Sequence, residues 1–357
     1  MKSHFSALLC GFLLTQIRAE VITLPHPGEV LPHQRTVIWS PVFQAAWDRL
    51  NADFGGPPLR VEPPNALMAK LDSFRWDAEK IMPAGSWKAW CGPATHGFLD
   101  QVNAEAAAIT KEAVGPFDLT AENPEHRAFF GLLDREVTFE REFFRSTKIP
   151  MMVRVKDSER AVRFFGVRGE ASGEIGASVR VLSWRPVDRS HAIQVCCKDS
   201  DDTVIFYLPP KEQDFATACR WIRTWRSQFK IGANSAGAWD DRILHSGDEI
   251  RIPYLTLESG ADLTPLFGGA RYYQTQKVPW RIVRAEQRTR FVLHEKGARV
   301  RVDVLGEAEP FAADPPPNVP RRFMYERPFF VFLWRDQAEW PYFGAWIGDA
   351  SAMKAFP

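Results

Sequence analysis

The stretch that decides the fold runs from His294 to Trp334. It begins His294-Glu295-Lys296-Gly297-Ala298-Arg299-Val300-Arg301-Val302-Asp303-Val304. From residue 298 to 304 apolar and charged side chains alternate with a period of two, which predicts a strand with one face on a core and the other toward water. The stretch ends in Pro328-Phe329-Phe330-Val331-Phe332-Leu333-Trp334, an unbroken apolar and aromatic run. Such a short run is typical of a strand that is buried on both faces.

A long polar segment, Gly306 to Arg322, separates these two predicted strands and is rich in proline. Proline removes backbone donors and favours extended, solvated backbone. A loop of this length in a compact domain is usually functional or disordered. Its one aromatic residue, Phe311, is either a contact for a partner molecule or a stray side chain on a surface linker.

Three motifs in this region resemble the serpins, a family of serine protease inhibitors. Glu295-Lys296-Gly297-Ala298 is similar to the family's hinge, which is Glu-(Glu/Lys)-Gly followed by a small residue. The segment from Phe323 to Phe332 resembles the strand after the reactive loop, with the pattern Phe-x-x-x-(Arg/Lys)-Pro-Phe-x-Phe. Tyr342-Phe343-Gly344-Ala345-Trp346-Ile347 resembles the closing Phe-x-Gly-x-Val strand. The resemblance is continuous over residues 190–350 and patchy before residue 190.

The resemblance implies an α+β fold of mixed and antiparallel sheets with surrounding helices and an exposed reactive loop, in a single domain over residues 20–357. In that family a protease cleaves the loop, and the freed loop inserts as a new strand into a sheet. The family's spacing places the scissile bond at Phe311-Ala312. A large aromatic residue before the cut suits a chymotrypsin-like target, or a cysteine protease that accepts aromatic residues.

The resemblance also implies which residues form the hinge, and here the sequence departs from the family. The hinge residues are Glu295, Gly297, Ala298, Val300 and Val302. Their alternation fits insertion, with the valines on the buried face. Inhibitory members nevertheless favour small residues there, and bulky valines and neighbouring arginines slow entry of the loop.

Two further departures from the family concern other parts of the chain. Gln287 replaces the family's histidine on the strand before the hinge, and residues 20–35 lack the period of the usual first helix. Three hypotheses therefore stay open. The chain is a protease inhibitor that uses Phe311, a non-inhibitory serpin-like protein whose loop is a cleavable or binding surface, or a Trp-rich secreted binding domain or hydrolase.

The sequence holds no motif that supports an enzyme: no paired carboxylates, nucleophile elbow or phosphate loop. We therefore expect no catalytic residues and no cofactor. Trp90, Cys91 and His96 lie close in sequence, but catalytic Cys–His pairs normally meet through the fold rather than along the chain.

Residues 1–19 predict a secretory signal peptide, with Lys2 at the start, an apolar run from Phe5 to Leu14, and Ala19 before the cleavage site. That run is too short to span a bilayer. Removing Lys2 and Arg18 from the 45 basic residues leaves 43 against 44 acidic residues, which argues against a nucleic-acid binder. We expect a secreted or periplasmic monomer that binds a target protease and neither nucleic acid nor membrane.

Four cysteines remain after such cleavage: Cys91, Cys196, Cys197 and Cys219. Their spacing fits no metal site. Neighbours in a strand point to opposite faces, so Cys196 and Cys197 are not expected to bond each other. Buried free thiols are the favoured interpretation, although an oxidising compartment allows one or two bridges.

Elsewhere the pattern predicts helices and a hairpin. Ser40-Pro41 is expected to cap a helix that starts at Val42 and stops at Gly55. In the helix over Phe215 to Phe229, Trp221 and Trp225 are expected on the core face. The remaining predicted elements are a helix over 103–114, strands within 129–143 and 151–165, and a hairpin of 192–197 with 203–208.

Overall fold

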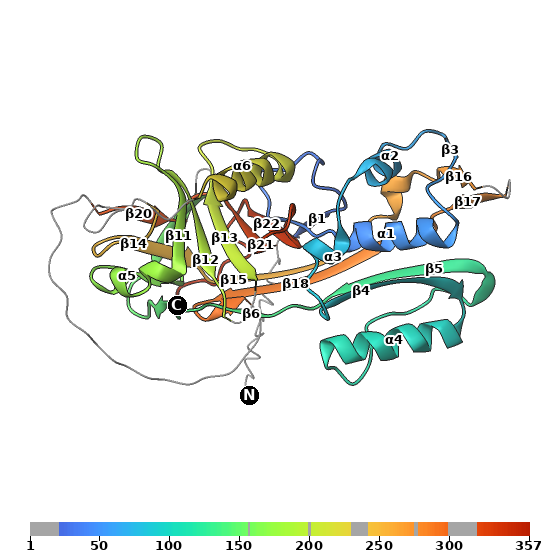
Figure 1. Ribbon diagram of the computed structural model, residues 1–357, viewed down its shortest axis with the longest axis horizontal. Coiled ribbons are helices and arrows are strands. Elements are labelled where there is room, and N and C mark those ends of the chain that lie inside the picture. The colour runs from blue at the N-terminus through green and yellow to red at the C-terminus, as the bar shows by residue number, and fades with distance from the viewer. Residues whose placement is uncertain (1–20, 156–157, 199–200, 230–241, 275–277, 299–319) are drawn as a thin grey trace, which may run out of the picture.

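The computed structural model describes residues 21–155, 158–198, 201–229, 242–274, 278–298 and 320–357 (Figure 1). The fold is α+β, with mixed and antiparallel sheets and surrounding helices, as the sequence predicted. Helices in these residues are α1 (Val42–Asp53), α2 (Ala66–Ser73), α3 (Ala78–Ile81), α4 (His96–Thr110), α5 (Ala171–Glu174) and α6 (Phe215–Gln228), with 3-10 turns at Gly176–Ser178 and Thr264–Phe267.

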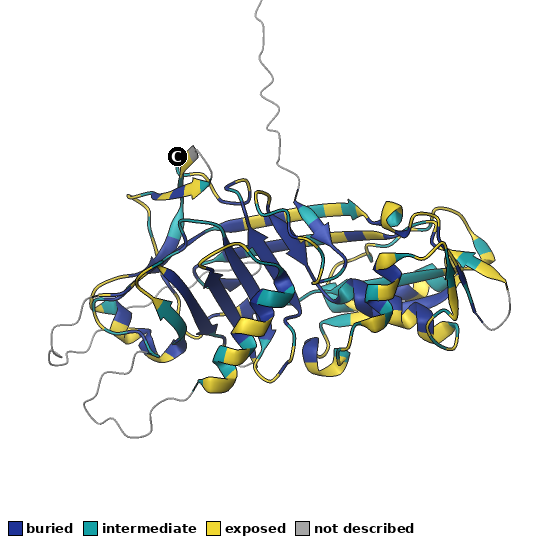
Figure 2. Ribbon diagram, turned by 90° about the horizontal axis from the view of Figure 1, so that it is seen from above, coloured by how far each residue is buried: buried dark blue, intermediate teal, exposed yellow. Residues whose placement is uncertain are grey.

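A seven-stranded sheet forms the most deeply buried part of the fold. Its spatial order is β1 (Ile22–Leu24), β2 (Val37–Trp39), β22 (Phe343–Ile347), β21 (Phe329–Arg335), β13 (Asp202–Leu208), β12 (Ser190–Cys196) and β11 (Val179–Arg185). Every residue of β21 except its last is buried, which confirms the prediction of a strand covered on both faces. Figure 2 shows the inner strands of this sheet almost uniformly dark blue, whereas the edge strand β11 is mostly of intermediate exposure. The predicted hairpin is the antiparallel β12–β13 pair.

Two further sheets are separate in the structure, and we call them together the split sheet. Four strands form one part, in the order β15 (Leu255–Asp262), β18 (Glu286–His294), β19 (Gly297–Ala298) and β6 (Val137–Thr138). The long strands β4 (Trp87–Ala94) and β5 (Asn123–Leu133) form the other part. Three residues separate the end of β5 from the start of β6, so the two parts are consecutive along this segment.

Smaller sheets complete the fold. The sheet that leads toward the C-terminal strands has the order β20 (Arg322–Met324), β14 (Glu249–Pro253), β10 (Phe164–Val167) and β7 (Phe144–Arg145). The others are β17 (Pro279–Arg281), β16 (Arg271–Tyr273) and β3 (Arg60–Glu62) in one sheet, and β8 (Met151–Val155) with β9 (Ser158–Val162) in another.

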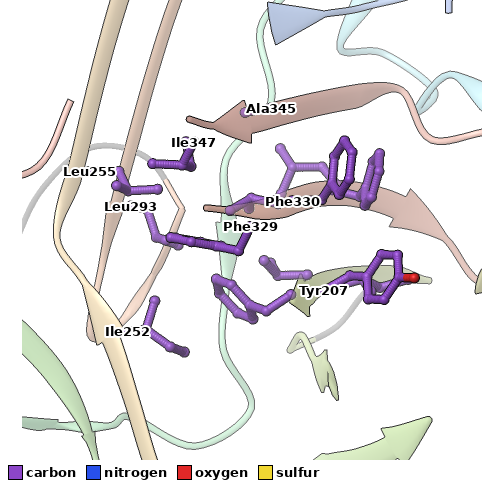
Figure 3. Close-up of a cluster of buried hydrophobic side chains, with 14 of the residues drawn as sticks. Tyr207, Ile252, Leu255, Leu293, Phe329, Phe330, Ala345 and Ile347 are labelled. Atoms are coloured by element: carbon purple, nitrogen blue, oxygen red, sulfur yellow. The ribbon is translucent and has the colours of Figure 1, made fainter. Parts of the chain in front are cut away.

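One hydrophobic core joins the seven-stranded sheet to the β15–β18 pair. Leu255 and Leu293 are register partners on β15 and β18, and both are about 1% exposed. Figure 3 shows their side chains gathered beside Ile347 and Phe329 from the seven-stranded sheet. Burying such aliphatic side chains contributes roughly 1.5–3 kcal/mol each, so β18 has a firmly held inner face.

Helix α6 confirms the predicted element but corrects one of its residues. Asp214 accepts a hydrogen bond from the Thr217 backbone N–H and caps the helix. Phe215 packs edge-on against Phe330 of the seven-stranded sheet, with ring centroids 5.5 Å apart. Trp221, predicted to lie in the core, is 50% exposed and stacks on Trp225 instead. Its position falls at the border of the helix's buried face, where periodicity discriminates poorly.

Helices α1 and α4 differ in detail from prediction. The Ser40 hydroxyl donates to the Tyr342 carbonyl oxygen at 2.9 Å, and Pro41 occupies the N-cap position of α1. Helix α4 begins earlier than the alanine-rich segment because the Thr95 hydroxyl caps it, and it ends at Thr110. Within residues 21–41 the structure has no helix, so α1 is the first helix of the described chain, as the lack of helical period predicted.

Candidate functional site

The candidate site is the hinge, where the chain turns back after β18. Leu293 pairs with Ala298 and His294 with Gly297, so β18 and β19 form a tight hairpin. At the turn, the Lys296 backbone N–H donates to His294 Nδ1 at 3.2 Å. Gly297 has φ of 149°, and a Cβ there would overlap the Val137 carbonyl oxygen. The close approach of two backbones therefore explains the glycine of this motif.

Strand β19 lies between β18 and β6. Gly297 pairs with Thr138 and Ala298 pairs with Val137, both antiparallel. Ala298 is 2% exposed, and Gly297 is also buried. The first two residues after the turn are thus already a central strand of the four-stranded sheet, flanked on both sides.

Glu295 anchors the turn although it is a buried acid. It is 4% exposed and forms an ion pair with Arg145 of β7, with 2.5 Å between Nη2 and Oε1. Its backbone carbonyl accepts a hydrogen bond from the Phe143 N–H at 3.0 Å. Burial, together with a hydrogen bond to Glu295, raises the pKa of Tyr254. A buried charge needs such partners, and here they tie the hinge to β7 and to the residue before β15.

Beyond this hairpin the edges of the split sheet face no other described strand. On its hinge side β18 pairs with β19 through Leu293 and His294 only, and β5 pairs only with β4 among the described strands. Unpaired strand edges are templates for an added strand. Gln287 of β18, the residue in place of the family's histidine, is 8% exposed and donates to the Thr289 hydroxyl at 3.3 Å.

A second anchor holds the chain where description resumes at residue 320. Arg321 and Asp248 are 6% and 1% exposed, and Arg321 Nη2 lies 2.7 Å from Asp248 Oδ2. The Arg321 backbone N–H also donates to Asp248 Oδ1 at 2.8 Å. Arg322 then begins β20, which pairs parallel with β14 and leads into β21. The chain on this side is therefore fixed to two sheets.

Three of the predicted site residues lie together in the structure, and the others lie outside the described residues. Glu295, Gly297 and Ala298 form the hinge. Val300, Val302, Phe311 and Ala312 lie outside the described residues. Sequence reasoning missed the partners that fix the hinge and the second anchor, because none belongs to a local motif: Val137, Arg145, Tyr254, Asp248 and Arg321.

The four cysteines are free thiols, as favoured from the sequence, and three of them are buried. Burial raises the pKa of Cys91 and of Cys197 to about 12. Because the thiolate is the nucleophilic form, such thiols are inert at neutral pH. Among the residues that the structure describes, no cluster of metal-ligating side chains and no helix long and apolar enough to cross a membrane is found.

No family model matches this sequence, and no curated protein matches it. Solved structures do match. A thyroxine-binding globulin in complex with thyroxine overlaps with a TM-score of 0.50 at 13% identity, over 89% of this chain and 93% of that one. A mouse protein-Z dependent protease inhibitor overlaps with a TM-score of 0.52 at 11% identity, over 88% of this chain and 91% of that one. The chain has a divergent serpin-like fold.

Proposed function

We propose that this protein is an exported serpin-type inhibitor, cleaved at Phe311-Ala312 by a chymotrypsin-like serine protease or a cysteine protease. After cleavage, the segment that follows Ala298 inserts along β18 in the split sheet. The observation that carries the proposal is the hinge itself, where Gly297 and Ala298 already pair with β18 on one side and with β6 on the other.

Continuing the two registers predicts how the inserted segment would pair. Along β18, Val300 falls opposite Phe291, which is 6% exposed and on the same face as the core residue Leu293. Toward β5, Arg299 falls opposite Glu136 and Arg301 opposite Asp134. Opposite charges directly across strands stabilise pairing by roughly 0.2–1 kcal/mol. We therefore expect Arg299 and Arg301 to hinder insertion less than the sequence alone indicates.

The two anchors favour separation of the cut ends. The Arg321–Asp248 pair and β20 would hold the C-terminal side of the cut, while the N-terminal side continues from β19. Trapping requires that insertion be faster than hydrolysis of the acyl-enzyme, in which the protease is covalently bound to the N-terminal fragment.

The test is incubation with chymotrypsin, and separately with a papain-like protease, followed by a denaturing gel. A band that combines protease and N-terminal fragment and survives denaturant supports the proposal for that protease class. Val300→Pro removes a backbone donor from the inserting strand and should convert the inhibitor into a cleaved substrate. Val300→Ala, the matched control, should retain the complex. Cleavage without any covalent band in the parent protein overturns the inhibitory proposal.

A second candidate is a serpin-like protein that does not inhibit, whose loop is a cleavable or binding surface. The valines of the hinge favour it, because bulky β-branched residues slow entry. Nicking near Phe311 with no covalent band would support this candidate. A large rise in Tm after nicking would then show that the segment inserts without trapping. The third hypothesis, a Trp-rich secreted binding domain, gains no support from the exposed Trp221, which stacks on Trp225.

Export is tested separately from inhibition. Secretion of the full chain from a bacterial or eukaryotic host, followed by N-terminal sequencing, should give a mature start at Glu20. If residues 1–19 are still attached to the protein, whether or not the host secretes it, the signal-peptide assignment is wrong.

A further inference from the structure

A cavity lies beside the hinge. Its volume is about 490 Å³, and it lies between β7, the β15–β18 pair and the chain segment 354–357. That volume is typical of a site for a small molecule. The lining combines apolar residues, among them Val292 and Phe356, with the basic side chains of Arg145, Arg163 and Lys354.

A ring of three backbone hydrogen bonds fixes two of these basic residues. The Arg163 N–H donates to the Lys354 carbonyl at 2.8 Å, and the Lys354 N–H donates to the Tyr254 carbonyl at 3.0 Å. The Tyr254 N–H donates back to the Arg163 carbonyl at 3.1 Å. All three residues line the cavity. The backbone below the two cations is therefore preorganised, which lowers the entropic penalty of binding a ligand.

The charges of the side chains that line the cavity do not balance. Arg145 is paired with Glu295, the one acidic side chain of the lining. Arg163 and Lys354 form no ion pair with any residue in the described part of the chain, and His294 lies on the same lining. Two cations over a partly apolar wall attract an anion more strongly than a neutral molecule.

We propose that this cavity binds a small amphiphilic anion, with an apolar body and one carboxylate, sulfate or phosphate group. Arg163 and Lys354 hold the anionic group, since guanidinium and ammonium groups are suited to such oxygens. Val292 and Phe356 contact the body. The proposal goes beyond the inhibitory function and does not depend on cleavage of the loop.

The same geometry links occupancy to the hinge. His294 and Glu295 belong both to the lining and to the β18–β19 turn, so a ligand that contacts them changes the stability of the hairpin. An anion also competes with Glu295 for Arg145. Neutralising Glu295 therefore releases a third cation to the ligand and strengthens binding.

The probe is 8-anilinonaphthalene-1-sulfonate, an aromatic body with one sulfonate, followed by fluorescence and calorimetric titration of the full-length folded protein. The expected result is one saturable site whose affinity falls about tenfold in Arg163→Gln, equal to losing one charge-assisted hydrogen bond. Arg220→Gln, which removes an exposed arginine on α6, is the matched control and should bind like the parent. Equal affinity in Arg163→Gln and Arg220→Gln overturns the proposal.

Two further arms separate charge from hydrophobicity. Uncharged N-phenyl-1-naphthylamine should bind more weakly than the sulfonate, and Lys354→Gln should leave its affinity unchanged. Tighter binding of the uncharged probe would overturn the anion assignment. Glu295→Gln should raise affinity for the sulfonate several-fold, and a fall would show that Glu295 does not compete for Arg145. Near-ultraviolet circular dichroism, identical across the variants, confirms that each comparison is made on folded protein.

Discussion

The seven-stranded sheet and the split sheet differ in how completely their strands are paired and buried. In the seven-stranded sheet, β12, β13, β21 and β22 pair on both sides and are buried almost throughout. In the split sheet, β5 carries partly and fully exposed residues, and one edge of β5 and most of one edge of β18 have no described partner strand. The difference follows both composition and pairing: β21 is an apolar run with a partner strand on each side, whereas β5 begins with polar and charged residues and has one partner among the described strands.

The largest expected loss of stability comes from a substitution in the seven-stranded sheet. Phe332→Ala on β21 removes a fully buried ring and should lower the free energy of unfolding by about 3–5 kcal/mol, through lost burial and a cavity. Phe129→Ala on β5 removes a half-buried ring and should lower it by less than about 2 kcal/mol. Urea unfolding measures both. Equal losses would remove the energetic contrast between the sheets.

The second anchor, the buried ion pair of Arg321 and Asp248, should give the next largest loss of stability. Arg321→Met leaves the Asp248 carboxylate buried without its charged partner, which typically lowers the free energy of unfolding by about 3–5 kcal/mol. Arg321→Met combined with Asp248→Asn removes the unpaired charge and keeps one side-chain oxygen, which can accept from one of the two backbone N–H groups, of His245 and Arg321, that the carboxylate binds. The double variant should therefore be more stable than the single one. A less stable double variant would mean that the pair acts through something other than charge compensation.

The seven-stranded sheet also contains a histidine that makes the stability of the fold depend on pH. His191 of β12 is 1% exposed, and burial lowers its pKa to about 3 from an ordinary value of 6.5. The unfolded chain therefore binds a proton that the folded chain does not, so stability is complete above pH 6.5 and falls as the pH drops toward 3. Between pH 6.5 and about 4.5 the loss should be about 2–3 kcal/mol.

The control for this pH effect is His191→Phe, which fits among the neighbouring rings of Trp184, Phe323 and Tyr325. Denaturant unfolding at a series of pH values should show a shallower pH dependence in this variant over that window. Parallel curves for the parent and His191→Phe would contradict a neutral buried histidine.

The smallest expected effect lies at the hinge. Gly297→Ala places a Cβ against the Val137 carbonyl at a positive φ, which should destabilise β19 locally by about 1–3 kcal/mol. Hydrogen exchange by mass spectrometry should speed up at 137–139 and 293–298. Gly260→Ala on β15 faces open space and serves as the control, with no change expected. Unchanged exchange in Gly297→Ala would mean that β19 does not depend on the close approach of the two backbones.

The local sequence pattern predicted the strands of the seven-stranded sheet better than those of the split sheet. The apolar run 328–334 and the hairpin 192–208 became β21 and the β12–β13 pair, because continuous β-branched and aromatic runs specify buried strands. The exposure of Trp221 and the tertiary bond of Ser40 escaped prediction, because each depends on which surface packs against the helix. At the hinge, the sequence identified Glu295, Gly297 and Ala298 through a resemblance, not through the contacts that hold them.

The sequence by itself determined the strand-forming runs, the glycine of the hinge, the neutral overall charge and the thiols without metal spacing. These are local properties, and residue type and period encode them. Only the tertiary structure decided that Glu295 meets Arg145, that Arg321 meets Asp248, and that β5 pairs with β4 alone among the described strands. Each of these joins residues far apart along the chain, and a single chain's local pattern carries no signal for which distant partners will share a buried site.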